Sequence, residues 1–349
     1  MMPRSMKLSI LDQSPIISGH SAAQAIAETL KLAHRADNLG YHRYWLAEHH
    51  AIAALADPCP EILLARLGAE TKRIRIGTGG VLLPYYSAFK VAEIFKMIEA
   101  LYPGRVDLGI GRAPGGDQRT ARAVGGGHIA DAEQFPQQVW ELVGHLDGTL
   151  PEDHPFKKVR AQPGGRIAGP VAPELWLLGS SDYSGLLAAQ LGVRFSFAHF
   201  INAQGGDLVT RAYKERFQAR DGNTEGPSPR EGAPHAAVCC FAICAESDAE
   251  AERLARVVDC RRLDMAYNLD TPVPTQEEAE RRTFNDQERA HIQSQRARLV
   301  HGSAETCKEK LLQIAEQFSA DELMVLTITG DYATRLDSYE RLARAFKLD

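Results

Sequence analysis

Eight short apolar segments, separated by longer stretches with helical periodicity, constrain the fold of this chain more than any other feature. Each segment is rich in branched or aromatic residues and is followed by polar residues or glycine. This pattern is typical of parallel strands that are buried on both faces and joined by helical crossovers. The segments are residues 8–11, 44–47, 74–77, 106–111, 175–178, 195–200, 237–244 and 323–328. We therefore predict an α/β fold in which eight strands close into a (β/α)8 TIM barrel.

The chain has 349 residues, whereas a barrel of this type needs roughly 250 plus insertions. We predict a single domain over residues 1–349, with inserted loops at about 147–173 and 264–300. The first insertion is rich in proline and glycine, which indicates an irregular loop or a short hairpin. The second is highly charged, and we interpret it as a mobile lid over the barrel mouth, with an inert surface insertion as the alternative.

Composition argues against several classes of protein. The formal net charge of −5 provides no basic surface for nucleic acid, and no apolar run approaches the ~20 residues of a membrane span. The N-terminal segment has only a very short apolar stretch, so we predict no signal peptide. The six cysteines form no C-x-x-C pair and no zinc-ligand spacing, which favours reduced thiols in a cytoplasmic protein.

In TIM-barrel enzymes the active site lies on the loops that follow the strands. Glu48-His49-His50 follows the second predicted strand, and an imidazole there can exchange a proton near neutral pH. Because neighbouring side chains on a strand point to opposite sides, at most one of the two histidines faces the barrel axis. The alternative is a histidine that bonds to the loop backbone. A metal site is disfavoured because the H-E-x-x-H motif is absent and no third ligand is apparent.

Three glycines stand in the four residues Gly77-Thr78-Gly79-Gly80, within a strand-like run. Glycine weakens a strand and often marks a bulge or the close approach of a ligand to the backbone. A flat aromatic cofactor would require such a surface. The alternative is a simple bulge of the barrel.

Two further loops suit an anion. Arg112 ends the fourth strand in LGIGRAPGGD, which is not a dinucleotide fingerprint because a proline replaces its third glycine. A guanidinium there can bind a phosphate or carboxylate through two oxygens, or form a structural salt bridge. The fifth strand is followed by Ser180, Ser181 and Ser184, whose hydroxyls could hold an anion at a helix N-terminus or merely cap the helix. A hydrolase triad is poorly supported, because no G-x-S-x-G motif is present.

Five strings resemble the bacterial luciferase-like family of flavin-dependent monooxygenases, in particular its group 1 oxidoreductases. They occur in the family's order and span nearly the whole chain. The strings are LDQSPI, GYHRYWLAEHH, RIRIGTGGVLLPYYSAFKVAE, LYPGRVDLGIGRAPGGD and LGSSDYSGLLAAQLG.

The resemblance implies that FMN binds at the barrel mouth. His49 matches the family's active-site histidine, and Gly79 and Gly80 match a pair that forms a non-proline cis peptide behind the flavin ring. Gly111 corresponds to a position beside the flavin that is cysteine in the luciferases. The matches to the phosphate site are Arg112 and Ser181, with Ser184 in place of a family threonine and Ser180 in place of a family glutamate. We assign Asp12, Gln13 and Tyr44 to the substrate pocket.

The resemblance further implies that reduced FMN and O2 oxidise a small organic substrate through a C4a-peroxyflavin. A separate NAD(P)H:FMN reductase would supply reduced FMN, in keeping with the absence of a nicotinamide-binding motif, and the family suggests a homodimer. Two alternatives remain open at this point. One is an oxidoreductase that uses the deazaflavin F420, and the other is a non-catalytic flavin-binding protein.

Overall fold

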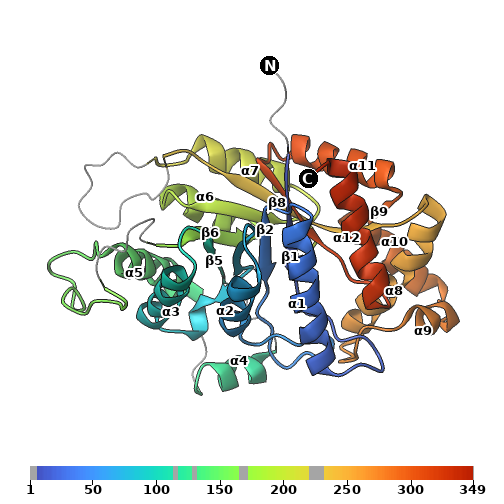
Figure 1. Cartoon of the computed structure of the whole chain (residues 1–349), viewed down its shortest axis with the longest axis horizontal. Helices are drawn as coiled ribbons and strands as arrows, with labels where there is room; N and C mark the ends of the chain where they lie inside the picture. Colours follow the sequence, from blue (N-terminus) through green and yellow to red (C-terminus); the bar gives the residue numbers. More distant parts are fainter. Residues whose placement is uncertain (1–5, 113–116, 128–131, 165–171, 220–231, 349) are drawn as a thin grey trace.

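The computed structural model describes residues 6–112, 117–127, 132–164, 172–219 and 232–348. Parallel strands form a closed barrel surrounded by helices (Figure 1). The ring closes because β10 pairs in parallel with both β1 and β8. The eight barrel strands are β1 (Lys7–Asp12), β2 (Arg43–Leu46), β3 (Arg75–Thr78), β5 (Val106–Gly111), β6 (Glu174–Gly179), β7 (Arg194–Ala198), β8 (Ala236–Cys244) and β10 (Glu322–Leu326). Each overlaps one of the predicted segments, so the predicted TIM barrel is confirmed.

Two short strands extend the barrel at positions that the apolar pattern does not indicate. β4 (Val81–Leu82) pairs with the end of β5, and β9 (Leu299–Gly302) pairs with residues 241–244 of β8. β8 therefore pairs with the barrel strands β7 and β10 through its first half and with β9 through its second half.

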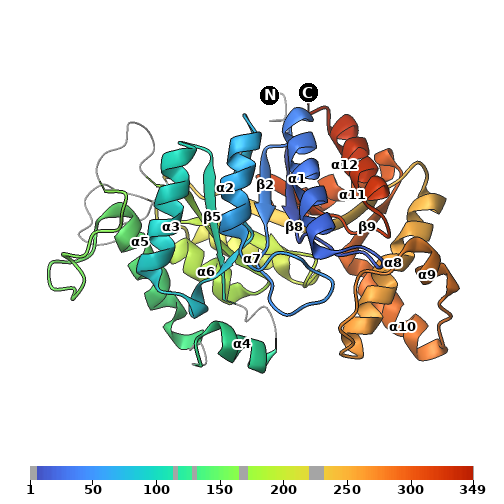
Figure 2. The ribbon, with the colours of Figure 1, turned by 60° about the horizontal axis from the view of Figure 1, so that its bottom comes forward.

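The helices begin where capping residues predict. Ser21 forms a capping box with Gln24 at the start of α1 (Ala22–Asn38), and Ser303 caps α11 (Ala304–Gln317). α3 (Ala88–Leu101) follows the cap Ser87, and α12 (Tyr332–Phe346) follows the cap Asp331. Figure 2 shows α1, α2 (Pro60–Glu70) and α3 in a row along the outside of the barrel. The remaining helices of the barrel layer are α4 (Gln118–Val124), α5 (Phe135–Asp147), α6 (Asp182–Gln190), α7 (Gly206–Glu215) and α8 (Asp248–Ala266).

The start of α2 is set by Pro60 and not by the earlier Pro58. α2 begins at Pro60, and Cys59 before it has an extended φ of −142°. A residue that precedes proline is driven out of the helical region by the proline ring, so Pro60 rather than Pro58 becomes the first helical residue.

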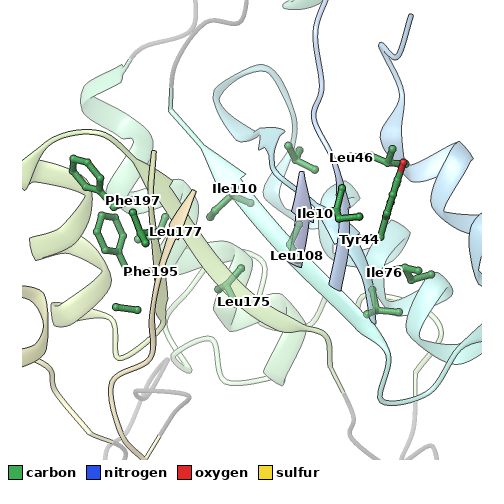
Figure 3. Close-up of a cluster of buried hydrophobic side chains, with 14 of the residues drawn as sticks. Ile10, Tyr44, Leu46, Ile76, Leu108, Ile110, Leu175, Leu177, Phe195 and Phe197 are labelled. Carbon is green, nitrogen blue, oxygen red and sulfur yellow. The ribbon is translucent and has the colours of Figure 1, made fainter. Parts of the chain in front are cut away.

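Strand alternation divides the core into two layers. Side chains that face outward pack beneath the helices, and Figure 3 shows this outer layer with Ile10, Tyr44 and Leu46 on adjacent strands. Side chains that face inward include Leu11 and Trp45, which belong to a separate cluster inside the barrel. Thus the neighbours Tyr44 and Trp45 lie on opposite sides of the same strand.

The N-terminal end of the barrel interior is closed by a buried charge network. Arg43 contacts Asp107 at 2.9 Å, Glu322 at 2.9 Å and Glu174 at 2.8 Å, and its side chain is 1% exposed. Trp45 Nε1 also donates to Asp107 at 2.9 Å. Burial opposes ionisation of Asp107 and Glu322, but the nearby positive charge of Arg43 outweighs it and holds the pKa of both carboxyls below their ordinary values.

The charged insertion at 264–300 is folded. α8 continues to Ala266 and is followed by α9 (Gln276–Arg281) and α10 (Asp286–Gln295), each with a capping box, at the right of Figures 1 and 2. Val273 exchanges backbone hydrogen bonds with the loop after β1, donating to Ile16 at 2.8 Å and accepting from Ser18 at 2.7 Å. The segment is therefore a small helical layer attached to the barrel loops.

The other insertion, at 147–173, forms turns and no strand over residues 148–164, and residues 165–171 lie outside the described part. All six cysteines are free, and only Cys59 is partly exposed. Within the described residues, no helix has the length and apolarity needed to traverse a bilayer.

Candidate active site

A cavity of about 590 Å³ opens among the loops that follow the barrel strands, within the usual size range for a small-ligand site. Its floor is apolar and is built from inward side chains of the barrel, including Leu11, Trp45 and Met324. The predicted residues that line the cavity are Gln13, His49, Gly79, Gly80, Gly111, Arg112, Ser180, Ser181 and Ser184. The structure thus gathers residues from the ends of five strands around one apolar floor.

His49 lies on the loop after β2, and its backbone N–H donates to the Asp57 carbonyl at 3.1 Å. The preceding residue, Glu48, fixes this loop from the other side. It accepts hydrogen bonds from the Leu82 amide at 2.9 Å and the Tyr86 hydroxyl at 2.5 Å, and it pairs with His50 at 2.7 Å. His50 is therefore held by Glu48, while His49 is the histidine that reaches the cavity.

The His49 imidazole is neutral at pH 7. Burial lowers its pKa to about 4, against a hydrogen bond to the Ala47 backbone that raises it, and the positive charge of Arg261 lowers it slightly further. Nδ1 is buried and has no hydrogen-bond partner. A neutral imidazole with a free nitrogen can accept or donate one hydrogen bond to a ligand in the cavity.

Gly79 and Gly80 form one wall, and the peptide bond between them is cis, as the resemblance implies. A Cβ on Gly80 would lie 2.6 Å from the Gly109 carbonyl oxygen, and one on Gly79 would lie 2.5 Å from Leu11. The wall is therefore bare backbone that is pressed against the neighbouring strand. A Cβ on Gly111, by contrast, would meet nothing within 4 Å, because this residue borders open space.

Arg112 directly follows β5, the strand that pairs with β4 beside the glycine wall, and its guanidinium carbon lies 4.3 Å from the centre of the Tyr183 ring. Tyr183 belongs to the first turn of α6, so this contact places the guanidinium beside the helix N-terminus. No carboxylate among the described residues lies within ion-pair distance of Arg112, so the structural salt bridge considered above is not formed.

The N-terminus of α6 completes this charge arrangement. Ser181 occupies the N-cap position, but its hydroxyl makes no capping hydrogen bond. Ser184 is packed so closely beneath Gly179 that a Cβ there would lie 2.3 Å from the Ser184 hydroxyl oxygen. The loops after the neighbouring strands β5 and β6 thus bring a helix N-terminus, hydroxyls and a guanidinium to one cavity, and we call this group the anion cradle: Arg112, Ser180, Ser181 and Ser184.

A sequence profile described as luciferase-like monooxygenase matches residues 6–322. The chain belongs to the luciferase-like monooxygenase family. It is 42% identical to an uncharacterised Bacillus subtilis protein, YwcH, over 98% of this chain and 99% of that protein. It is 34% identical to the N-acetyl-S-alkylcysteine monooxygenase of the same organism, over 97% and 98% of the two chains. Among solved structures, apo-MsnO8 is similar with a TM-score of 0.85 and 34% identity, covering 99% of both chains.

Two residues assigned to the substrate pocket of this family member do not reach the cavity. Asp12 and Tyr44 are fully buried in the outer layer, where the Tyr44 hydroxyl donates to Asp12. Arg335 of α12 donates to the same carboxylate at 2.5 Å. The reason is strand alternation, since Leu11, Gln13 and Trp45 face the cavity and their neighbours must face away.

The predicted lid of this luciferase-like chain does not line the cavity in the structure, because none of residues 264–300 contributes to its wall. Its two adjacent basic residues are both engaged elsewhere. Arg281 pairs with Glu277, and Arg282 pairs with Asp264 at 2.6 Å. A role of this segment as a mobile lid stays a prediction.

The structure also shows residues that sequence reasoning did not find. Trp45 and Glu48 line the cavity beside His49. Alternation along β2 could have indicated Trp45, but no sequence signal identifies Glu48 as the anchor of its loop. Within the described residues, no group of three histidine, cysteine or acidic side chains is arranged to hold a metal ion.

Proposed function

We propose that this protein is an FMN-dependent monooxygenase that oxidises a small organic substrate with O2. The observation that carries the proposal is the pairing of the anion cradle with the bare Gly79-Gly80 wall in one cavity of suitable size. FMN has one phosphate at one end and a flat ring system at the other. Its site therefore requires an anion-binding group for the phosphate and a wall without side chains for the ring. The apolar floor supports the same conclusion, because it keeps water from the reacting groups.

Arg112, Ser181 and Ser184 would hold the phosphate, and the Gly79-Gly80 backbone would support one face of the ring. When bound in its reduced form, FMN supplies the electrons that activate O2 for transfer of one oxygen atom to the substrate. The protein's own contribution is to hold FMN and the substrate in the relative orientation that the reaction needs and to exclude water from the site.

His49 would contribute a hydrogen bond rather than a proton at neutral pH. Its pKa of about 4 leaves almost no imidazolium at pH 7, and its unpartnered Nδ1 is available to the substrate or to the reacting oxygen. Gln13 lines the same cavity and would contact the substrate.

Reduced FMN would come from a separate NAD(P)H:FMN reductase, because the chain carries no nicotinamide-binding fingerprint. The name of the 34% identical Bacillus subtilis relative, an N-acetyl-S-alkylcysteine monooxygenase, supports oxygen transfer to a small molecule. It does not by itself give the substrate of this chain.

The test is an anaerobic titration of the purified protein with reduced FMN, followed by rapid mixing with oxygenated buffer. We expect tight binding and then a long-lived absorbance distinct from that of oxidised FMN. Binding without such a species would favour a flavin carrier. Failure to bind FMN, together with hydride transfer from reduced F420, would favour the deazaflavin alternative.

Two arginine variants make the test specific. Arg112→Gln should weaken FMN binding by about tenfold or more, because a charged hydrogen bond to the phosphate is lost. Arg66→Gln serves as the control, since Arg66 is exposed and pairs only with Glu70 one helical turn away. Equal FMN affinity in the two variants would contradict the assignment of the cradle.

A further inference from the structure

A second cavity lies in the helical layer outside the barrel, between the start of α3, one face of α5 and the 147–173 insertion. The two helices pack side by side, far from α9 and α10 (Figures 1 and 2). The cavity volume of about 230 Å³ is below the usual range for drug-sized ligands, so it suits a smaller molecule. It shares no lining residue with the active-site cavity, and the proposed function gives it no role.

Three segments that are distant in sequence meet at this cavity. Gln138, Glu141 and His145 of α5 line it, and their spacing of three and four residues places them on one face of the helix. Phe89 lines it from the first turn of α3, and Phe156 lines it from the insertion. The insertion therefore has a place in the structure as one wall of a small site.

Aromatic rings form the apolar part of the cavity. Phe156 is 51% exposed, although a phenylalanine without a binding role is usually buried. Phe89 packs its ring against His145 with 5.1 Å between the ring centres. Tyr86 also lines the cavity, but its hydroxyl donates to Glu48 at 2.5 Å, so the ring is what it offers to a ligand. The faces of such rings are electron-rich and attract cations.

The ionised side chain of the cavity is an acid. Glu141 accepts a hydrogen bond from Gln137 Nε2 at 3.2 Å, and His154 Nε2 lies 3.7 Å from the same carboxylate. A carboxylate can accept several hydrogen bonds, so Glu141 keeps free capacity. Burial lowers the pKa of His145, which is therefore neutral at pH 7, and the described lining residues include no lysine or arginine. The cavity thus favours a positive ligand over a negative one.

The remaining polar groups point to the same kind of ligand. The Gln138 Oε1 atom is buried and has no hydrogen-bond partner, which leaves an acceptor for a ligand N–H or hydroxyl. The N-terminus of α3 borders the cavity and would otherwise suit an anion. The Ser87 hydroxyl already caps this helix by accepting the Lys90 amide.

We propose that this cavity binds a small organic ammonium ion, with its charge beside the Glu141 carboxylate and its carbon groups against the rings of Phe89 and Phe156. The Gln138 amide oxygen would accept a hydrogen bond from a hydroxyl or N–H of the same ligand. The proposal goes beyond the proposed function and does not rest on it, because the two cavities are separate.

The test uses choline as the probe and 3,3-dimethyl-1-butanol as its uncharged counterpart of the same shape, each titrated calorimetrically into the protein with and without FMN. Choline should bind at least about fivefold more tightly than the alcohol, because only choline carries the charge. Its affinity should be the same with and without FMN. Equal affinities for choline and the alcohol would overturn the proposal. Displacement of choline by FMN would also overturn it, since choline would then occupy the active site.

A pair of glutamate variants locates the charge. Glu141→Gln should weaken choline binding by about fivefold or more, because the negative partner of the ammonium group is lost. Glu309→Gln is the matched control. Glu309 accepts from Gln313 Nε2 at 3.1 Å one helical turn away, as Glu141 does from Gln137, but it is exposed on α11. Equal choline affinity in the two variants would contradict the site.

A third variant tests the aromatic wall without disturbing the core. Phe156→Ala removes an exposed ring from a turn, so the fold should be unaffected. Choline binding should weaken about threefold or more in this variant, because a ring beside the ammonium group is lost. Choline affinity equal to that of the wild type would overturn the proposal.

Discussion

The two ends of the barrel differ in whether their buried polar groups have partners. At the N-terminal end, Arg43 is surrounded by three carboxylates at 2.8–2.9 Å, and each charge has a partner. At the C-terminal mouth, His49 has an unpartnered nitrogen, and Arg112 forms no ion pair with a described residue. The same closed sheet carries both arrangements about one strand length apart.

The difference indicates that one end of the barrel contributes to folding and the other to ligand binding. Charges that satisfy one another add order to the barrel but leave nothing to offer a ligand. Groups left without partners cost stability, and the cost is recovered when a ligand supplies the missing partner. Substitutions at the N-terminal end should therefore affect folding, and substitutions at the mouth should mainly affect binding.

The largest expected effect comes from breaking the N-terminal network. Arg43→Met should lower the free energy of unfolding by about 3–5 kcal/mol, because it leaves Asp107 and Glu322 buried without their main counter-charge. Arg112→Met at the mouth should change it by less than about 1 kcal/mol. Urea unfolding of both variants measures the contrast, and similar losses at the two ends would show that the comparison is mistaken.

The glycine wall gives the next contrast. Gly80→Ala should destabilise the protein by about 1–3 kcal/mol, since the new Cβ would lie 2.6 Å from the Gly109 carbonyl oxygen. Gly111→Ala should be within about 0.5 kcal/mol of the wild type, because its Cβ would point into open space. If both substitutions were tolerated alike in thermal unfolding, the wall would be less rigid than the structure indicates.

Acidification should separate the buried imidazoles from the carboxylates of the N-terminal network. The pKa of His49 is about 4 in the folded protein and near 6.5 in the unfolded chain, so between these values only the unfolded chain binds the proton. Stability should therefore fall by about 2 kcal/mol between pH 7 and pH 5 because of this group. The carboxylates at the N-terminal end have lowered pKa values, so they weaken the fold only below about pH 4.

His49→Gln isolates this effect. The variant keeps every other titrating group, including His42, whose pKa burial also lowers to about 4. Its stability should fall less steeply than that of the wild type from pH 7 to pH 5. Parallel curves for the two proteins would mean that His49 is not held neutral by its surroundings.

The smallest effect distinguishes two serines at helix N-caps. The Ser303 hydroxyl oxygen accepts a hydrogen bond from the Thr306 amide at the start of α11, so Ser303→Ala should cost about 1 kcal/mol of stability. The Ser181 hydroxyl makes no capping bond, so Ser181→Ala should leave stability unchanged and weaken FMN binding severalfold. A stability loss in Ser181→Ala equal to that in Ser303→Ala would assign Ser181 to the helix instead of the ligand.

Much of the barrel could be predicted because its strands are buried on both faces and therefore appear as continuous apolar runs. Glycine and serine at the ends of those runs located the cavity wall and the cradle. Asp12 and Tyr44 were misplaced because a run that is apolar throughout does not reveal which residues face inward. The structure settles this through Trp45, which contacts Asp107 inside the barrel and leaves Tyr44 on the outside.

The order of the 264–300 segment could not have been predicted for a different reason. The stability of α9 and α10 depends on their packing against α8 as well as on their caps, and the sequence does not show that packing.

The contacts of Glu48 have a consequence for how such a protein can diversify. Glu48 ties the His49 loop to Leu82 and Tyr86, which follow the glycine wall and do not belong to the loop after β7 that brings Phe200 and Ile201 to the cavity. The loop after β7 can therefore change in length and sequence while the imidazole keeps its place. A new substrate preference could in this way evolve while His49 and the glycine wall stay unchanged.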